Sequence, residues 1–138
     1  MPKLVRLSIS LEKSLYDRLE EMVDRSGYTN RSEYIRDLIR ERRVEEEWHG
    51  GKEVVGTLTL VYDHHARQLN ERLVDLQHHH HHEILVTTHV HLDARMCAEV
   101  TIMKGKASDL RRIADLLRQQ KGVLHGALSF SSTGSGLE

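Results

Sequence analysis

The sequence has one cysteine, Cys97, one proline, and few aromatic residues, which make up 4% of its 138 residues. One cysteine cannot form an internal disulfide, so a small disulfide-held fold is excluded and the thiol is available for metal ligation or core packing. The sequence contains no apolar stretch approaching the roughly 20 residues of a membrane-spanning helix. It also begins without the apolar run of a signal peptide. We therefore expect a cytoplasmic protein.

An excess of charge of one sign is also missing. The formal net charge is -1 at pH 7, so any binding of nucleic acid must depend on a local basic surface rather than on the total charge. Histidine, in contrast, is abundant, with eleven residues. This many imidazole groups in a short chain favours a role in metal binding or pH sensing.

The N-terminal part has the pattern of one strand followed by two helices. Residues 4–11 alternate between apolar and polar side chains, which is typical of a strand with one buried face. A first helix is expected to end at Gly27, and a second to begin at Asn30, with Glu33 completing a capping box, and to extend to about residue 47. Because a lone strand cannot satisfy its own backbone edges, we expect it to pair with the same strand of a second chain.

Such a two-stranded ribbon has side chains suited to DNA on one face. A β-ribbon fits the major groove, where arginine binds guanine bidentately and hydroxyl groups meet several base edges. The candidates for base contacts are Arg6, Ser8 and Ser10. The N-terminus of the second helix offers free N–H groups and a positive dipole end to a phosphate, and the candidates there are Asn30, Arg31 and Ser32. The alternative is a plain amphipathic strand whose polar residues face water.

After Gly50 and Gly51, the chain reads as a second unit. Strand, helix, strand, strand, helix and strand are expected over residues 54–62, 66–77, 84–91, 96–104, 108–120 and 123–131. This order is the split βαβ arrangement of ferredoxin-like domains, with both helices on one side of an antiparallel sheet. The predicted fold class is α+β, with domains over residues 1–48 and 53–132, a linker over 49–52 and a disordered tail over 133–138.

A candidate metal site lies in this second unit. His89 and His91 are two residues apart on an expected strand, so both side chains lie on the same face. The return strand can place Cys97 beside them, and a neighbouring subunit can supply His78, the first residue of a run that ends at His82. Three imidazoles and one thiolate suit tetrahedral zinc or square-planar nickel or copper, and the spacing does not choose among these metals.

The histidine run also has other interpretations. It can be an expression tag or a solvated linker, and a His-x-His pair on a strand is more often structural. Tags usually lie at a terminus, whereas this run joins an expected helix to an expected strand. The combination of the run, the His-x-His pair and the downstream cysteine favours a metal site.

Taken together, these motifs resemble the NikR family of nickel-responsive regulators. The resemblance rests on LQHHHH at residues 76–81, HVH at 89–91 and Cys97, behind a unit whose residues 27–33, GYTNRSE, resemble the ribbon-helix-helix fold of dimeric repressors. It covers nearly the whole chain except the last few residues. It implies a homotetramer in which two DNA-binding dimers flank four ACT-like domains. It also implies square-planar nickel, held by His89, His91 and Cys97 of one subunit and His78 of another.

The resemblance implies further roles near these sites. Glu99 is expected to orient a ligand histidine, and Tyr62 and His64 to lie near the metal or a secondary site. Glu33 and Asp37 match a cation site between the two domains in the DNA-bound form, although both can equally be solvated helix carboxylates. The family's ribbon positions match the three candidates for base contacts, with serine where threonine is often found. An extra histidine, His82, suggests weaker additional metal binding.

The expected function is that of a transcriptional repressor in which Ni(II) promotes binding to a palindromic operator that controls nickel-uptake genes. One alternative is a nickel or zinc storage or delivery protein without DNA binding, for which the N-terminal ribbon has no purpose. The other alternative is an enzyme, which is disfavoured because four protein ligands leave a square-planar metal no open position for catalysis.

Overall fold

The computed structural model describes residues 2–138, which form two compact units. The first contains the chain up to Arg43 together with Gly136–Glu138, and the second contains Val44–Ser135. The division lies within the second helix, so the last turn of that helix packs with the second unit. None of the helices in residues 2–138 is long and apolar enough to cross a membrane.

The first unit contains α1 (Lys13–Ser26) and most of α2 (Arg31–His49). Gly27 ends α1 in the left-handed conformation, with a φ of 80° that glycine adopts without a steric cost. At the start of α2, the side-chain oxygen of Asn30 accepts a hydrogen bond of 2.9 Å from the backbone N–H of Glu33. The two expected helices and the Asn30 cap are therefore confirmed.

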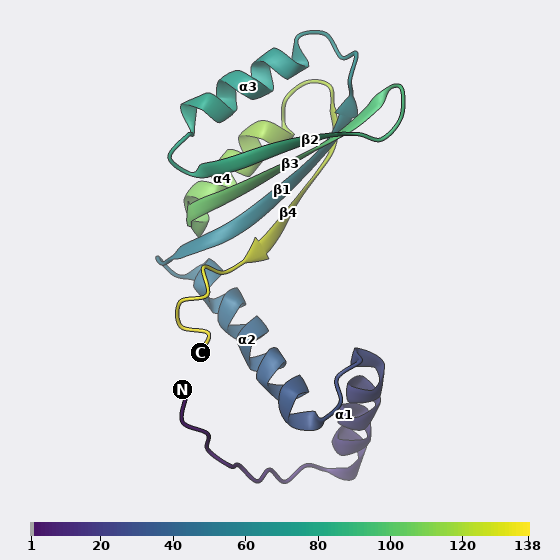
Figure 1. Cartoon of the computed structure of the whole chain (residues 1–138), viewed down its shortest axis with the longest axis vertical. Coiled ribbons are helices and arrows are strands. Elements are labelled where there is room, and N and C mark those ends of the chain that lie inside the picture. Colours follow the sequence, from purple (N-terminus) through teal and green to yellow (C-terminus); the bar gives the residue numbers. More distant parts are fainter. Residues whose placement is uncertain (1) are drawn as a thin grey trace. The chain divides into compact units, whose positions relative to one another are not determined.

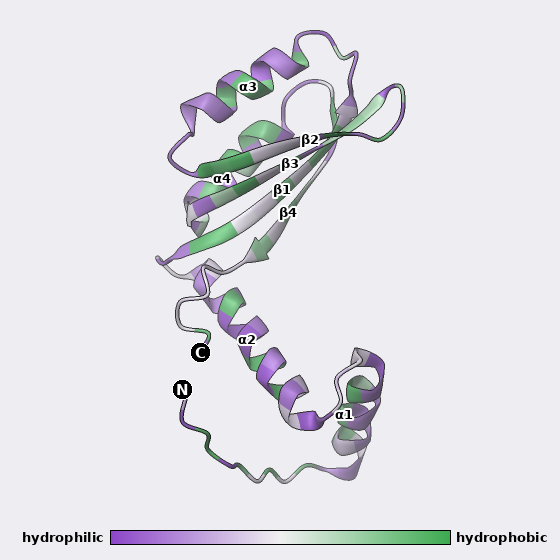
Figure 2. Cartoon of the chain, in the orientation of Figure 1, coloured by the Kyte–Doolittle hydropathy of each residue, from purple (hydrophilic) through white to green (hydrophobic). Residues whose placement is uncertain are grey.

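The segment before α1 differs from the sequence prediction, because residues 4–11 form no strand within one chain. Leu4, Val5 and Leu7 are each about four-fifths exposed, and Figure 2 shows hydrophobic residues along this segment. The physical reason is that a strand needs a second strand to pair its backbone groups, and the structure contains one copy of the chain.

The second unit is built on a four-stranded sheet. Its strands are β1 (Glu53–Asp63), β2 (Ile84–His91), β3 (Met96–Lys106) and β4 (Val123–Ser131). They lie in the order β2-β3-β1-β4, and every neighbouring pair is antiparallel (Figure 1). This is the sheet of the predicted βαββαβ fold, with strand boundaries within two residues of those expected.

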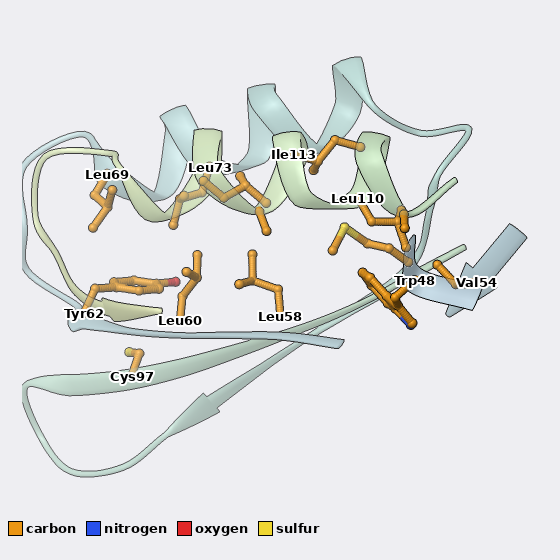
Figure 3. Close-up of a cluster of buried hydrophobic side chains, with 14 residues drawn as sticks. Trp48, Val54, Leu58, Leu60, Tyr62, Leu69, Leu73, Cys97, Leu110 and Ile113 are labelled. Atoms are coloured by element: carbon orange, nitrogen blue, oxygen red, sulfur yellow. The ribbon is translucent and has the colours of Figure 1, made fainter. Parts of the chain in front are cut away.

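Two helices, α3 (Leu69–His79) and α4 (Ala107–Arg118), cover one face of the sheet. Figure 3 shows side chains from both helices meeting those of β1, and the buried residues drawn there include Leu58, Leu60, Leu73, Leu110 and Ile113. The apolar stripe of each helix is thereby removed from water. α3 begins three residues later than expected and continues to His79, so that His78 lies within its last turn.

The last turn of α2 is fixed to the sheet by Trp48, which is 3% exposed. Its indole N–H donates a hydrogen bond of 2.7 Å to the carbonyl oxygen of Ser131, and its ring lies 4.4 Å from that of Phe130. The ring covers Gly56, where an added Cβ would come within 2.9 Å of it. Glycine at this position therefore permits the close packing of α2 on β1.

Candidate metal centre

The β2–β3 hairpin brings the expected ligands together. His91 lies directly opposite Cys97, and His89 opposite Glu99, with 3.7 Å between the Sγ of Cys97 and the Nδ1 of His91. The hairpin turn is held by Asp93, whose carboxylate accepts backbone hydrogen bonds of 2.7 Å from Arg95, in the turn, and of 2.8 Å from Met96, the first residue of β3. Two successive hydrogen bonds to one carboxylate fix the turn that sets this register.

His64 joins the same cluster from the loop after β1. Its backbone N–H donates a hydrogen bond of 2.6 Å to the carbonyl oxygen of Arg95, and Arg95 forms an ion pair of 2.9 Å with Asp63. These contacts hold the loop against the hairpin turn. The ring of His64 then lies 5.1 Å from that of His91 and 6.0 Å from that of His89, measured between centroids.

The cluster of His64, His89, His91 and Cys97 fits a metal ion. One ligand atom from each residue lies within 4.8 Å of the others. The Nδ1 atom of His64 is buried without a hydrogen-bond partner, an arrangement that costs free energy unless another group or an ion binds there. Imidazole nitrogens and a thiolate are the donors that nickel, copper and zinc share. The donor set of this cluster is therefore compatible with a nickel site.

The environment of Cys97 keeps its thiol protonated in the absence of metal. Burial raises the pKa of this thiol, and the nearby carboxylates of Asp63, Asp93 and Glu99 raise it further. Because the thiolate is the form that binds a metal, a metal ion must displace a proton from Cys97. Metal binding at this site is therefore coupled to proton release.

Hydrogen bonds extend from the cluster to Tyr62, predicted to lie near the metal or a secondary site, and to Glu99, predicted to orient a ligand histidine. The hydroxyl of Tyr62 donates a hydrogen bond of 2.8 Å to Glu99 and lies 3.3 Å from the Nδ1 of His89. Burial, followed by this hydrogen bond to Glu99, raises the pKa of Tyr62. The second carboxylate oxygen of Glu99 accepts a hydrogen bond of 2.5 Å from the amide of Gln77, a residue for which the sequence pattern predicts no role.

The structure places His78 outside the cluster formed within one chain. It lies exposed in the last turn of α3, with its ring 6.4 Å from that of His81. The ring of the extra histidine, His82, lies 4.1 Å from that of His81. The run is therefore a surface feature of one chain, divided between the end of α3 and the following turn.

The candidate DNA-contacting residues lie in the first unit. Arg6, Ser8 and Ser10 are exposed in the segment before α1, and Asn30, Arg31 and Ser32 are exposed at the start of α2. A groove in this unit has Ser10 and the three residues at the start of α2 in its wall, beside apolar residues that include Leu7, Ile9 and Ile35. Arg31 also forms an ion pair of 3.2 Å with Glu20.

The two carboxylates of the predicted cation site also lie in the first unit. Glu33 is exposed in the first turn of α2, and Asp37 is half-buried one turn later. Asp37 accepts a hydrogen bond from Tyr28, and this bond raises the pKa of the Tyr28 hydroxyl. Asp37 therefore has a structural partner within the unit.

Comparison with known proteins matches both parts of the chain. Residues 55–131 match the model of the NikR C terminal nickel binding domain, and residues 5–46 match that of the ribbon-helix-helix protein, copG family. Relatives named "Putative nickel-responsive regulator" include one from Geobacter sp. (strain M21), 51% identical with 99% of each chain covered. Another, from Pyrococcus furiosus, is 45% identical, with 95% of this chain and 96% of the relative covered.

A solved structure, that of an uncharacterized protein from Thermotoga maritima, shares the fold alone. It aligns with a TM-score of 0.51 at 16% identity, covering 57% of this chain and 98% of that one.

Proposed function

Because the chain belongs to the NikR family of nickel-responsive regulators, we propose that it is a repressor whose binding to operator DNA is promoted by Ni(II). The family is non-enzymatic, its C-terminal domain binds nickel, and its N-terminal domain is a ribbon-helix-helix DNA-binding domain. The observation that carries the proposal is the cluster of three imidazoles and a thiol formed by the β2–β3 hairpin and the loop after β1. It occurs in a chain that also contains a DNA-binding domain.

The proposed nickel ligands are His89, His91 and Cys97, with a fourth ligand from a second subunit. His78 suits this last role because it is exposed at the end of α3 and contributes nothing to the cluster of its own chain. His64 is the rival fourth ligand, since it already lies in the cluster with an unpartnered ring nitrogen. A ligand from a second subunit makes nickel occupancy depend on assembly, whereas His64 allows one chain to enclose the ion.

The proposed assembly is a tetramer of two DNA-binding dimers joined by four C-terminal domains. In each dimer, residues 4–11 of two chains pair as a ribbon that places Arg6, Ser8 and Ser10 in the major groove of a palindromic operator. The exposed apolar side chains of this segment support the pairing, because a second copy removes them from water. At the N-terminus of α2, the proposed phosphate contacts are Asn30, which precedes the helix, Arg31 and Ser32.

The remaining assignments follow from the same proposal. The regulated genes are those for nickel uptake, and the protein works in the cytoplasm. The DNA-binding domain comprises residues 1–48, the linker 49–52, the metal-binding domain 53–132 and the tail 133–138. Glu33 and Asp37 bind a cation when DNA is bound, and His82 adds weaker metal binding.

A gel-shift experiment with a palindromic operator duplex tests the proposal. The unmodified protein should bind the duplex with nickel and lose most of that affinity when the metal is chelated. Arg6→Ala should lose specific DNA binding and keep nickel, whereas Cys97→Ala should lose nickel and the metal-dependent DNA binding. Nickel binding without any metal-dependent DNA binding would instead support storage or delivery.

A further inference from the structure

A continuous chain of hydrogen bonds joins the metal cluster to the end of α3. It begins at the Nδ1 of His89, 3.3 Å from the hydroxyl of Tyr62, and continues from this hydroxyl to Glu99 over 2.8 Å. It ends at the amide of Gln77, 2.5 Å from the second oxygen of Glu99. Four residues from β2, β1, β3 and α3 are thus connected through side chains alone.

The number of protons available sets the direction of these hydrogen bonds. Tyr62 has one hydroxyl proton, which it donates to Glu99, so its oxygen is left to accept from His89. The Nδ1 of His89 must then carry the proton of the neutral ring, and Nε2 keeps a lone pair. A histidine ring is oriented for metal binding when its Nδ1–H donates a hydrogen bond to a neighbour and the lone pair of Nε2 is available to the metal.

Glu99 depends on both of its partners. It is 6% exposed, so water does not readily replace a lost hydrogen bond, and each carboxylate oxygen has one of the two donors. A buried carboxylate without a partner is costly. Removal of the Gln77 amide therefore leaves one oxygen unsatisfied and frees the carboxylate to turn away from Tyr62.

Gln77 also has a special position in the sequence. It is half-buried in the last turn of α3 and directly precedes His78. The same turn contains the partly buried Leu76, which packs against the core. The hydrogen bond to Glu99 thus helps to fix the position of this turn over β3 and its rotation about the helix axis.

We propose that Gln77 is a positioning residue for the metal site, which orients the ring of His89 through Glu99 and Tyr62 and fixes the turn of α3 that presents His78. This inference rests on the proposed nickel function and extends it to a residue outside the ligand set. It makes the orientation of one ligand and the placement of another depend on the same hydrogen bond.

The first test uses the metal-free protein. Gln77→Met keeps a side chain of similar length and similar helix propensity but removes the donor, and Gln119→Met is the matched control at an exposed position at the end of α4. Nitrogen-15 NMR of the histidine rings, with His89 assigned by His89→Gln, should show one Nδ1-protonated tautomer in the parent and the control. Gln77→Met should show a mixture of both tautomers. An unchanged tautomer in Gln77→Met would overturn the inference.

The second test measures nickel and uses a rescue. Loss of a partner that supports a metal ligand typically lowers metal affinity 10- to 100-fold, and we expect about tenfold for Gln77→Met, with a shifted thiolate-to-nickel absorption band. The exchange Gln77→Glu with Glu99→Gln puts the amide on β3 and the carboxylate on α3. It should recover most of the affinity that either single change loses, which a merely structural role does not predict.

The outcomes separate this inference from the proposed function. If the parent binds nickel and Gln77→Met binds it equally well, Gln77 has no positioning role and the proposed function stands. A double exchange as weak as the single variants would also count against the relay. If the parent binds no nickel, the proposed function fails, while the tautomer of His89 in the metal-free protein still tests the relay.

Discussion

At the scale of single residues, the identity of the fourth metal ligand is the most informative question. His64 and His78 are both available, the first inside the cluster of its own chain and the second on the surface of α3. We expect His78→Ala to abolish the square-planar absorption spectrum of the nickel-loaded protein, and His64→Ala to retain it. His79→Ala is the matched control, because its ring contacts the backbone of its own helix. The reverse result would place nickel within a single subunit.

The thiol of Cys97 predicts a pH dependence of nickel binding. Burial raises its pKa above the ordinary value, so at neutral pH the metal-free thiol is protonated and each bound nickel must displace that proton. Below this pKa, the thiol alone should therefore decrease nickel affinity by roughly tenfold for each unit that the pH falls. Calorimetric titration in buffers of different ionisation enthalpy should detect the released proton, and Cys97→Ser should release fewer. Affinity independent of pH would contradict this coupling.

At the scale of elements, the packing of α2 against β1 depends on the absence of a side chain at Gly56. Gly56→Ala places a Cβ within 2.9 Å of the ring of Trp48, and overpacking of this kind typically costs about 1–3 kcal/mol of unfolding free energy. Urea unfolding followed by the fluorescence of Trp48, the one tryptophan of the sequence, measures the loss. Gly51→Ala is the control, since an added Cβ there meets no atom within 4 Å. Equal stability of the two variants would show that the ring moves aside without cost.

The elements themselves were largely predictable because their signals are local. Strand alternation, the apolar stripes of α3 and α4, the Asn30 cap and the Gly27 end all depend on residues a few positions apart. β2 and β4 begin and end at the predicted residues. The predicted strand over residues 4–11 is the exception. Its backbone groups need a second strand to pair with, and no segment of the same chain provides one among the residues that the structure describes.

The site was only partly predictable, for a related reason. His89, His91 and Cys97 are linked by one hairpin, so their spacing indicates that they meet. His64 reaches the same place through a loop held by a backbone hydrogen bond to Arg95, a contact between segments about 30 residues apart that no spacing rule supplies. Nothing in the sequence around Gln77, which directly precedes the histidine run, predicts a role for its amide. Its contact with Glu99 depends on how α3 packs on the sheet.

At the scale of the whole molecule, the exposed apolar segment before α1 indicates self-association. Leu7 and Ile9 are 79% and 57% exposed, and other exposed apolar residues lie beside them in the sequence. A stable monomer rarely exposes a group of neighbouring apolar side chains of this kind. We expect Leu7→Glu to weaken dimerisation and DNA binding together, since a charge replaces a side chain that the second copy buries. Analytical ultracentrifugation measures the first effect and gel shift the second, while Lys3→Glu, an exposed change in the same segment, controls for charge. Unaltered association would exclude this segment from the dimer interface.

The metal cluster and the candidate DNA-contacting residues lie in separate compact units, so the proposed regulation requires a thermodynamic coupling between them. If nickel tightens binding to the operator by some factor, operator DNA must tighten nickel binding by the same factor. Allosteric coupling typically amounts to about 5- to 150-fold, and we expect both measurements to give one value within that range. Nickel affinity is measured by competition with a chelator, with and without the palindromic duplex, and a duplex of scrambled sequence controls for nonspecific binding to phosphates. Equal nickel affinity with and without the operator would contradict the coupling. It would show that metal binding and DNA binding are energetically independent in this protein.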